Sequence, residues 1–249
     1  EIVLGTPVEE VIIEGKRAKA IIVQTKIGLK RIEAGCVVCT VPVRRIFKII
    51  LERYFPSDFV RKINERYWDI SMLSGYIGLK RNIIQDKNIN PKSWIVVPSI
   101  IKAGEGYVGD VDIVTFVSSN FSPTRSPEGK HLLEFSIALT PEELRDKKKV
   151  DRVINEVMAF MQRSFPTWVE DIDWQLWIAS EGFGPCPPIG ERRPDVKCPW
   201  VDGLYFAGDG YGARRWGAGT EAAIHSAILC VDSMTGKDYL SEILPEYHR

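Results

Sequence analysis

The sequence has no long hydrophobic run and no excess of charge of either sign. Its longest apolar stretches, such as AIIVQ and GCVVCTVPV, are far shorter than the roughly 20 residues that a helix needs to cross a bilayer. The 33 Lys and Arg residues balance the 33 Asp and Glu residues. Because nucleic-acid-binding proteins usually carry a basic excess, this balance argues against that class of function.

Cysteine and histidine are scarce as well. Five cysteines, an odd number, fit a reducing compartment better than a disulfide scaffold, so we expect a cytoplasmic protein. Cys36 and Cys39 form a C-x-x-C motif, but positions three apart in a strand face opposite sides of a sheet. No second pair completes a zinc site, so we expect buried, unreactive thiols. His131, His225 and His248 are scattered, and we predict neither a metal site nor a Ser-His-Asp triad.

The first forty residues show short strands separated by turns. They begin EIVLGTPVEE, without an initial Met or the basic-then-apolar pattern of a signal peptide, and we expect a chain that is cut at its front. Strand signals lie around residues 8–13 and in AKAIIVQT, LKRIEA and GCVVCTV. We predict a β-meander over residues 1–42, with GCVVCTV as a fully buried fourth strand. One helix is expected after Pro42 and another from Ser57, as N-cap, to about Glu65.

Residues 43–198 combine several strands with one clear helix. Strands are predicted in MLSGYIGLK, SWIVVPS, DIVTFVSS, HLLEFSIAL and IDWQLWIAS. Thr140, Pro141 and Glu143 form a capping box with proline at the first helical position, and an apolar stripe follows as far as Met161. We therefore predict a mixed sheet with helices, and we expect Trp174 to pack in its core.

The stretch GLYFAGDGYGARRWGAGTEAAIHSA differs from the rest of the chain because glycine recurs through it, between Gly203 and Gly219. Its pattern predicts a strand, a glycine-rich loop and a helix from about Thr220. Glycines let the backbone approach a ligand closely, and a helix N-terminus offers free N–H groups to an electron-rich group. Asp209 would repel a phosphate but could bond a hydroxyl. A polyol that carries a phosphate would satisfy both features.

A nicotinamide-binding fingerprint can be fitted to this loop, but its context is wrong. The segments 208–213 and 217–222 both match G-x-G-x-x-A, which alone is a weak signal. A βαβ unit needs a helix and then a second strand with an acidic residue for the ribose, for which Asp232 is the candidate. AAIHSAILCVDSM has the apolar spacing of one continuous helix. We therefore do not predict a simple nicotinamide-binding fold.

The segment DGLYFAGDGYGARRWGAGTEAAIHSAILCVDSM resembles the C-terminal flavin motif of the FAD-dependent amine oxidase, protoporphyrinogen oxidase and phytoene desaturase superfamily. LGTPVEEVIIEGKRAKAIIVQTKIGLKRIEAGCVVCTVP is similar to the β-meander of the same enzymes. GYIGLKRNI and SSNFSPTRSPEGKHLLEFS resemble the substrate domain of the phytoene desaturase branch. The resemblance spans most of the chain and is strongest over residues 202–234.

This resemblance implies an α/β fold with an α+β substrate domain. We expect a meander segment of the FAD domain at 1–42, a substrate-binding domain at 43–198, an FAD-binding strand-loop-helix at 199–235 and a tail at 236–249. Asp209 would bond near the ribityl or pyrophosphate part of FAD, the helix start would face the flavin ring, and the backbone of Val8 would meet the adenine. The implied FAD-binding residues are Val8, Gly208, Asp209, Gly217, Gly219, Thr220 and Ala222.

The sequence departs from the superfamily in one respect. Members begin with a dinucleotide-binding βαβ unit that carries a GxGxxG loop, and nothing before residue 200 resembles it. We therefore expect an incomplete Rossmann-like FAD domain, completed by the missing N-terminal half in cis or as a separate chain. Alone, the chain should bind FAD weakly or not at all.

The resemblance also implies the reaction. The whole enzyme would pass a hydride from a small apolar substrate to the flavin, which carries the chemistry, so no catalytic acid or base is assigned. Trp177, Tyr211 and Trp216 are the candidates for lining the substrate site. We favour the phytoene-dehydrogenase-like branch. The alternatives are a flavin amine oxidase, a protoporphyrinogen oxidase and a non-catalytic module that completes a partner's site. An apolar substrate would also suit loose membrane association, for which the sequence offers no basic amphipathic anchor.

Overall fold

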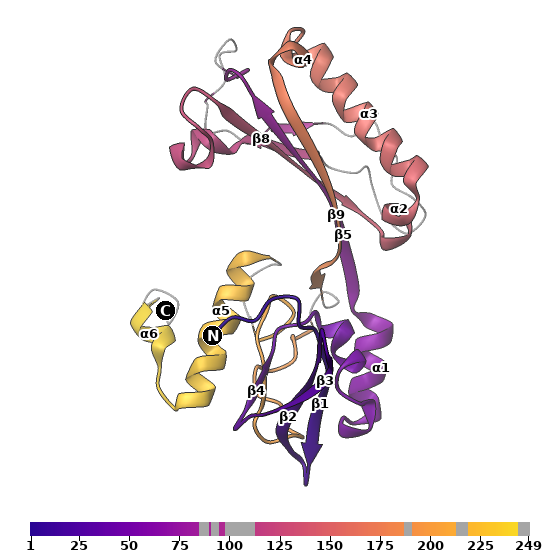
Figure 1. The fold of residues 1–249 in the computed structure, drawn as a ribbon, viewed down its shortest axis with the longest axis vertical. Helices are drawn as coiled ribbons and strands as arrows, with labels where there is room; N and C mark the ends of the chain where they lie inside the picture. The colour runs from indigo at the N-terminus through magenta and orange to yellow at the C-terminus, as the bar shows by residue number, and fades with distance from the viewer. Residues whose placement is uncertain (85–89, 91–94, 98–112, 187–190, 213–218, 244–249) are drawn as a thin grey trace. The chain divides into compact units, whose positions relative to one another are not determined.

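The computed structural model describes the chain except for residues 85–89, 91–94, 98–112, 187–190, 213–218 and 244–249 (Figure 1). The chain is a mixed α/β protein, as predicted, and forms two compact units. Unit 1 consists of residues 1–69 and 184–249, and unit 2 of residues 70–183.

The β-meander of unit 1 is confirmed for three of its strands. Strands β1 (Val8–Glu14), β2 (Arg17–Thr25) and β3 (Gly28–Glu33) form an antiparallel sheet in the order β1-β2-β3. Lys16 adopts a left-handed conformation with φ of 63° in the tight turn between β1 and β2.

The fourth predicted strand belongs to a different sheet. Strand β4 (Val37–Cys39) pairs in parallel with β10 (Leu204–Phe206), near the other end of the sequence. It is also not fully buried, because the Val38 side chain is 41% exposed. The sequence pattern was misleading because an apolar run shows that a strand can be buried, not which partner buries it.

The helices of unit 1 also differ in part from the prediction. Two 3₁₀ helices, η1 (Val43–Lys48) and η2 (Glu52–Tyr54), replace the single helix expected after Pro42. Helix α1 spans Ser57–Arg66, with Pro56 rather than Ser57 at the N-cap position. The C-terminal helices are α5 (Thr220–Thr235) and α6 (Tyr239–Ile243).

Asp232, the candidate ribose-binding residue of the rejected nicotinamide fold, has a local structural role. Its carboxylate accepts hydrogen bonds from the backbone N–H groups of Tyr239 and Leu240 and so holds the start of α6. Between α5 and residue 243 the described chain contains a helix and no strand. The prediction that AAIHSAILCVDSM forms one continuous helix is confirmed, since the whole segment lies within α5.

Unit 2 is built on a five-stranded sheet in the order β6-β7-β8-β5-β9. Its strands are β5 (Trp68–Leu79), β6 (Ile95–Val97), β7 (Ile113–Val117), β8 (His131–Leu139) and β9 (Ile172–Cys186). Strands β5 and β8 pair antiparallel from Ser71 opposite Leu139 to Leu79 opposite His131. Two short 3₁₀ helices, η3 (Ser118–Asn120) and η4 (Pro123–Arg125), connect β7 to β8.

The predicted capping box is present, but the helix behind it is split. The Thr140 side chain accepts a hydrogen bond from the Glu143 N–H, and the Glu143 carboxylate accepts one from the Thr140 N–H. This box begins α2 (Pro141–Arg145), and Asp146 then caps a second helix, α3 (Lys147–Ser164). A short helix, α4 (Trp168–Asp171), leads into β9.

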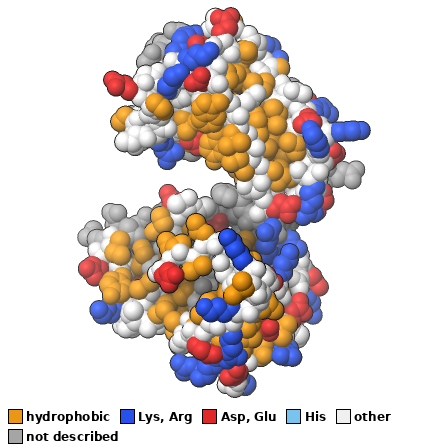
Figure 2. Space-filling model, viewed as in Figure 1, with side chains coloured by type: hydrophobic (Ala, Val, Ile, Leu, Met, Phe, Trp, Pro, Cys, Tyr) orange, Lys and Arg blue, Asp and Glu red, His pale blue; other side chains and the backbone are white. Residues whose placement is uncertain are grey.

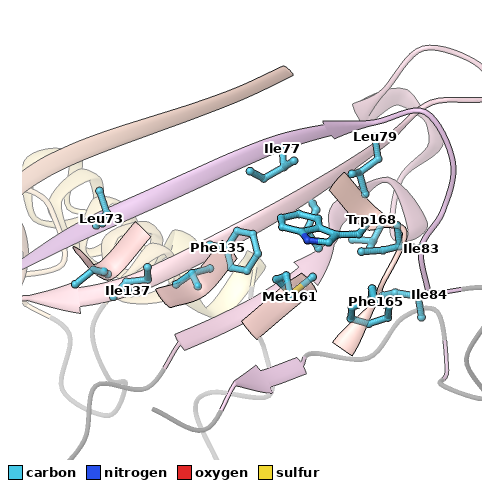
Figure 3. Close-up of a cluster of buried hydrophobic side chains, with 14 of the residues drawn as sticks. Leu73, Ile77, Leu79, Ile83, Ile84, Phe135, Ile137, Met161, Phe165 and Trp168 are labelled. Carbon is cyan, nitrogen blue, oxygen red and sulfur yellow. The ribbon is translucent and has the colours of Figure 1, made fainter. Parts of the chain in front are cut away.

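The core of unit 2 lies between one face of the sheet and α3 (Figure 3). Odd-numbered residues of β5 and β8 point to this face, and the predicted apolar stripe of α3 supplies Val153, Val157 and Met161. Trp168 of α4 is fully buried among them. Burying each of these side chains contributes about 1.5–3 kcal/mol.

In the part of the chain that the structure describes, no helix is long and apolar enough to span a membrane.

Candidate functional site

The strand-loop-helix predicted around the glycine-rich stretch is present in unit 1. Strand β10 ends at Phe206, and the chain turns at Gly208, whose φ of 140° a residue with a side chain rarely adopts. The Gly208 N–H donates a hydrogen bond of 3.1 Å to the Ser226 Oγ of α5. The loop is therefore fixed to the helix at this point.

Sequence reasoning missed Ser226. Its side chain is fully buried on the same stripe of α5 as Ala222 and Cys230, at helical spacings of four residues. A small polar residue on the buried face of an apolar helix is the signal that could have found it, since such a hydroxyl needs a partner.

Among the described residues, nothing caps the N-terminus of α5. Gly219 occupies the N-cap position with φ of 98° and makes no side-chain cap, and no atom of a described residue lies within 4 Å of where its Cβ would be. The first N–H groups of a helix have no partner within the helix and carry a partial positive charge. This end of α5 can therefore accept an electron-rich group.

Asp209 follows the carboxyl end of β10. Its side chain is half-buried, and its carboxylate makes no hydrogen bond or ion pair with another described residue. In α/β folds, ligands bind at the carboxyl ends of parallel strands. An acceptor with no partner among the described residues suits a ligand hydroxyl at this position.

Tyr211 lies in the core of unit 1. Its ring stacks on Phe206 at 5.0 Å with an interplanar angle of 8°, and its hydroxyl donates to the Val41 carbonyl at 3.1 Å. Burial raises the pKa of Tyr211 well above 10. These contacts hold the loop onto the unit, whereas the predicted contact of Tyr211 with a substrate stays a prediction.

The remaining residues predicted for the FAD site and the substrate site fall into three groups. Gly217 and Trp216 lie outside the described residues, so their roles stay predictions. Thr220 is exposed in the first turn of α5, and Ala222 is buried beneath it. Val8 begins β1, opposite Val23, in the meander.

A pocket of about 410 Å³ borders the strand-loop segment in unit 1, since Phe206 and Gly212 belong to its wall. Phe59 and Trp200 form an aromatic side, with ring centroids 4.7 Å apart. The pocket wall also contains charged residues, namely Lys62, Glu191, Arg192, Arg193 and Asp195. Glu191 is held by ion pairs with Lys62 at 3.1 Å and with Arg66.

The sheet of unit 2 has one covered face and one open face. The even-numbered residues of β5 from Met72 to Tyr76 and of β8 from Leu132 to Ala138 are half-buried on the face opposite α3. On this open face β9 places three large apolar side chains, Trp174, Leu176 and Ile178, all exposed. An antiparallel sheet commonly leaves one face to water, but that face is then polar, so three exposed hydrophobic residues in one row indicate a binding surface.

The two tryptophans of β9 lie in different surroundings. Trp177 stacks on Phe135 of the core at 5.8 Å, and its ring lies over Gly75. Trp174 lies over Gly78 and is 49% exposed, so the expectation that it packs in the core is wrong. Successive side chains of a strand point to opposite faces of the sheet, so Trp174 and Trp177, three positions apart, lie on opposite faces. Trp177 stays a prediction as a substrate contact, while Trp174 is better placed for one.

The C-x-x-C pair is split as predicted, but only one thiol is buried. Cys39 points into the core of unit 1, where burial raises the pKa of its thiol, whereas Cys36 is exposed. The expectation that both thiols are buried is therefore wrong for Cys36. Among the residues that the structure describes, no group of three or more potential ligands could hold a metal ion.

Residues 1–235 match the family described as flavin containing amine oxidoreductase. No curated protein matches the sequence. Among solved structures, an oxidoreductase from Methanosarcina mazei is similar, with a TM-score of 0.64 and 15% identity over 94% of this chain and 49% of its own.

Two further structures have the same partial coverage. A protein from Exiguobacterium named as a protoporphyrinogen oxidase has a TM-score of 0.57 and 12% identity over 94% of this chain and 47% of its own. Cyclohexylamine oxidase from Brevibacterium oxydans has a TM-score of 0.54 and 10% identity over 92% and 48%. At such identities the likeness shows the fold alone, and the chain spans about half the length of the structures it matches.

Proposed function

The chain belongs to the flavin containing amine oxidoreductase family, whose members are FAD-dependent oxidoreductases, and from this premise we propose that it is the C-terminal part of such an enzyme. The proposed reaction is transfer of a hydride from an apolar, phytoene-like substrate to the flavin. Unit 1 would contribute one side of the FAD site, and unit 2 would contribute the substrate surface. The other side of the FAD site would come from the missing N-terminal half, in cis or as a separate chain.

The described residues of unit 1 fit FAD. The half-buried Asp209 carboxylate suits a ribityl hydroxyl. The uncapped start of α5 at Gly219 can stabilise negative charge on a reduced ring. The Gly208–Ser226 hydrogen bond keeps these two elements together. When bound, the flavin accepts the hydride, and the protein positions it and tunes its electrostatics.

The open apolar face of unit 2 is the observation that carries the substrate class. Trp174, Leu176 and Ile178 supply a continuous apolar row, and Asp173 on the same strand is paired with Lys130 at 2.9 Å. Binding sites for small molecules are mostly apolar with few polar groups. A surface of this composition favours a hydrocarbon over a charged amine.

The test is flavin reduction by the assembled enzyme. The chain is co-expressed with the half that its relatives contain. The absorbance of the oxidised flavin is recorded without oxygen, and a polyene, an amine and a porphyrinogen are added in separate experiments. Loss of absorbance with a polyene supports the proposal. Loss with amines alone or porphyrinogens alone would assign the chain to those branches, and no loss with any class would favour a non-catalytic module.

A matched pair of variants tests the substrate surface. Leu176 on the open face and Val169 on α4 have similar exposure, 51% and 53%. Leu176→Gln should raise KM for the apolar substrate about tenfold, since it removes apolar contact worth about 1–2 kcal/mol, while Val169→Gln should leave KM unchanged. Equal effects of the two substitutions would show that unit 2 does not bind the substrate at this face.

The chain by itself should bind FAD weakly or not at all, because it offers one side of the site. Titration of the isolated chain with FAD, followed by flavin fluorescence, measures this. Tight stoichiometric binding would contradict the division of the site between two halves.

A further inference from the structure

A small pocket lies at one end of the open face of unit 2. It has a volume of about 160 Å³ and is lined by the end of β5, the starts of β8 and β9, and the turn between η4 and β8. Trp174, the first residue of the apolar row on β9, belongs to its wall, and a Cβ at Gly78 of β5 would lie 2.2 Å from the indole nitrogen. Figure 2 shows hydrophobic side chains gathered at the surface of unit 2, with charged side chains beside them. The pocket therefore continues the apolar row at its Trp174 end.

The turn that forms one wall of the pocket is held by its own hydrogen bonds. The Ser126 hydroxyl donates to the Lys130 carbonyl at 2.7 Å, and the Lys130 N–H donates to the Pro127 carbonyl at 3.0 Å. The Lys130 ammonium reaches the Asp173 carboxylate of β9 at 2.9 Å. The turn is therefore tied both to itself and to the strand that carries the apolar row.

The charged side chains that line the pocket are paired with opposite charges. Arg125 donates to the Glu134 carboxylate of β8 at 3.2 Å, and Lys130 is paired with Asp173. Burial lowers the pKa of His131, so its imidazole is neutral at pH 7. A carboxylate, phosphate or ammonium group that entered the pocket would therefore meet a like charge as well as an opposite one, and an uncharged group fits better.

Among the described residues, the pocket offers a hydrogen-bond donor and an acceptor that are free for a ligand. The Trp174 Nε1–H makes no hydrogen bond with another described residue. Asp173 uses Oδ2 for its bond from Lys130, which leaves Oδ1 available, and this bond lowers the pKa of Asp173, so the carboxylate stays ionised. A hydroxyl both donates and accepts a hydrogen bond, so it can satisfy both groups.

The size of the pocket limits what can enter it. A water molecule takes up about 30 Å³ in the liquid, so this pocket can hold a hydroxyl with a few carbon atoms but not a whole long-chain molecule. The rest of such a molecule must lie outside, and the row of Trp174, Leu176 and Ile178 leads away from the pocket along β9. At about 3.3 Å per residue, the row is roughly 13 Å long. An extended apolar chain can therefore lie on the row with one end in the pocket.

From these contacts we propose that unit 2 binds an apolar chain that ends in an uncharged hydroxyl. The hydroxyl lies in the pocket, where it donates to Asp173 Oδ1 and accepts from the Trp174 Nε1–H, and the chain lies along Leu176 and Ile178. This inference rests on the proposed function, because it names the end group of the substrate that the open face of unit 2 is proposed to bind.

The test compares four probes of similar chain length, added to the chain without FAD. The probes are decanol, its methyl ether, decanoate and decylamine, and their binding at pH 7 is measured by titration calorimetry. The ether accepts a hydrogen bond but cannot donate one to Asp173, so it should bind about tenfold more weakly than decanol. Decanoate and decylamine should also bind roughly tenfold more weakly, since each meets a like charge. Equal affinity of the four probes, or tighter binding of a charged probe, would overturn the proposal.

The Trp174 indole reports whether decanol occupies this pocket. Its N–H resonance in the NMR spectrum, assigned by its absence from Trp174→Phe, should shift when decanol is added. Trp174→Phe keeps an aromatic ring but loses the donor, so it should bind decanol about fivefold more weakly. Binding of decanol that leaves the Trp174 resonance unmoved would place the ligand elsewhere and overturn the proposal.

A matched pair of variants tests the acceptor. Asp173→Asn removes the charged acceptor and leaves the Lys130 ammonium without its carboxylate, so decanol should bind about tenfold more weakly and decanoate more tightly. Asp151→Asn on α3 breaks an ion pair of the same kind, with Lys147 at 2.6 Å, and does not line the pocket, so it should change neither affinity. Circular dichroism verifies the fold of both variants. Equal effects of the two substitutions would overturn the role of Asp173.

The outcomes distinguish this inference from the proposed function. Preference of the chain for decanol, with no flavin reduction by any substrate in the assembled enzyme, would refute the proposed function and leave the hydroxyl site intact. Flavin reduction by polyenes whose KM does not depend on a terminal hydroxyl would refute the hydroxyl site alone. If both proposals hold, a polyene with a terminal hydroxyl should have a KM about tenfold lower than the same polyene without it.

Discussion

The two units expose hydrophobic side chains for different reasons. In unit 2 the exposed residues Trp174, Leu176 and Ile178 lie in one row on one face of an antiparallel sheet, whose other face is sealed by α3. In unit 1 the exposed residues Val38 and Val231 belong to a sheet edge and to a helix that the unit covers only in part.

This difference follows from the two kinds of sheet. An antiparallel sheet can keep one open face, because its strands pair through local turns and one covered face supplies its core. A parallel sheet needs helices and further strands around it, because its strands are joined by crossovers. The open face of unit 2 is therefore a surface that can bind a ligand, whereas in unit 1 strand β4 has no second neighbouring strand among the described residues.

The largest effect is expected in the core of unit 2, and it tests whether this core lies on only one face of the sheet. Trp168→Ala removes a fully buried indole between the sheet and α3 and should lower the free energy of unfolding of unit 2 by about 3–5 kcal/mol. Trp174→Ala, on the open face, should cost less than about 1 kcal/mol. Urea unfolding followed by tryptophan fluorescence measures both. If the two substitutions lowered the free energy of unfolding by similar amounts, both faces of the sheet would be packed in the core, contrary to the structure.

A smaller effect is expected at the glycines beneath the two indoles. A Cβ at Gly75 would lie 2.5 Å from the Trp177 ring, which packs against the core of unit 2, so Gly75→Ala should cost about 1–3 kcal/mol. A Cβ at Gly78 also meets an indole, that of Trp174, but this ring can move into solvent. Gly78→Ala should therefore cost less, and a thermal unfolding series of the two variants decides between these outcomes.

Unit 1 should lose stability in alkali through its buried tyrosines. Burial raises the pKa of Tyr67 to about 12, and burial also raises the pKa of Tyr211 above its ordinary value of 10. Both folded-state values exceed the unfolded ones, so this contribution is complete below pH 10 and is lost as the pH rises above it. Tyr211→Phe should cost about 1 kcal/mol at pH 7 by losing the bond to Val41, and should reduce the alkaline loss.

Urea unfolding of the wild type and of Tyr211→Phe at pH 7 and at pH values above 10 measures this dependence. An alkaline loss of equal size in both proteins would contradict the role of Tyr211, and would leave Tyr67 as the responsible group.

The smallest perturbation is alkylation of the C-x-x-C pair. Cys36 is exposed, whereas burial raises the pKa of the Cys39 thiol, so iodoacetamide should modify Cys36 at least tenfold faster. Peptide mass spectrometry after timed alkylation at pH 7.5 gives the two rates. Equal rates would show that the region of β4 opens in solution and exposes Cys39, which would contradict the burial of Cys39 in the core of unit 1.

Much of the fold could be predicted from local patterns. The meander, the capping box at Thr140 and the strand-loop-helix around Asp209 depend on contacts between near neighbours, which sequence spacing records directly. The partner of β4 could not be predicted, because β10 lies at the far end of the sequence and an apolar run carries no information about its neighbour. The exposure of Trp174 and the burial of Trp177 depended on which face α3 covers.

The order of residues thus determined the local elements and placed a carboxylate and a helix start on either side of a glycine-rich loop. Only the tertiary structure decided that Ser226 ties that loop to α5, that the two indoles of β9 lie on opposite faces, and that β4 pairs with β10. The physical reason is that turns, caps and periodicity act over a few residues, whereas burial and strand pairing join segments that the sequence keeps far apart.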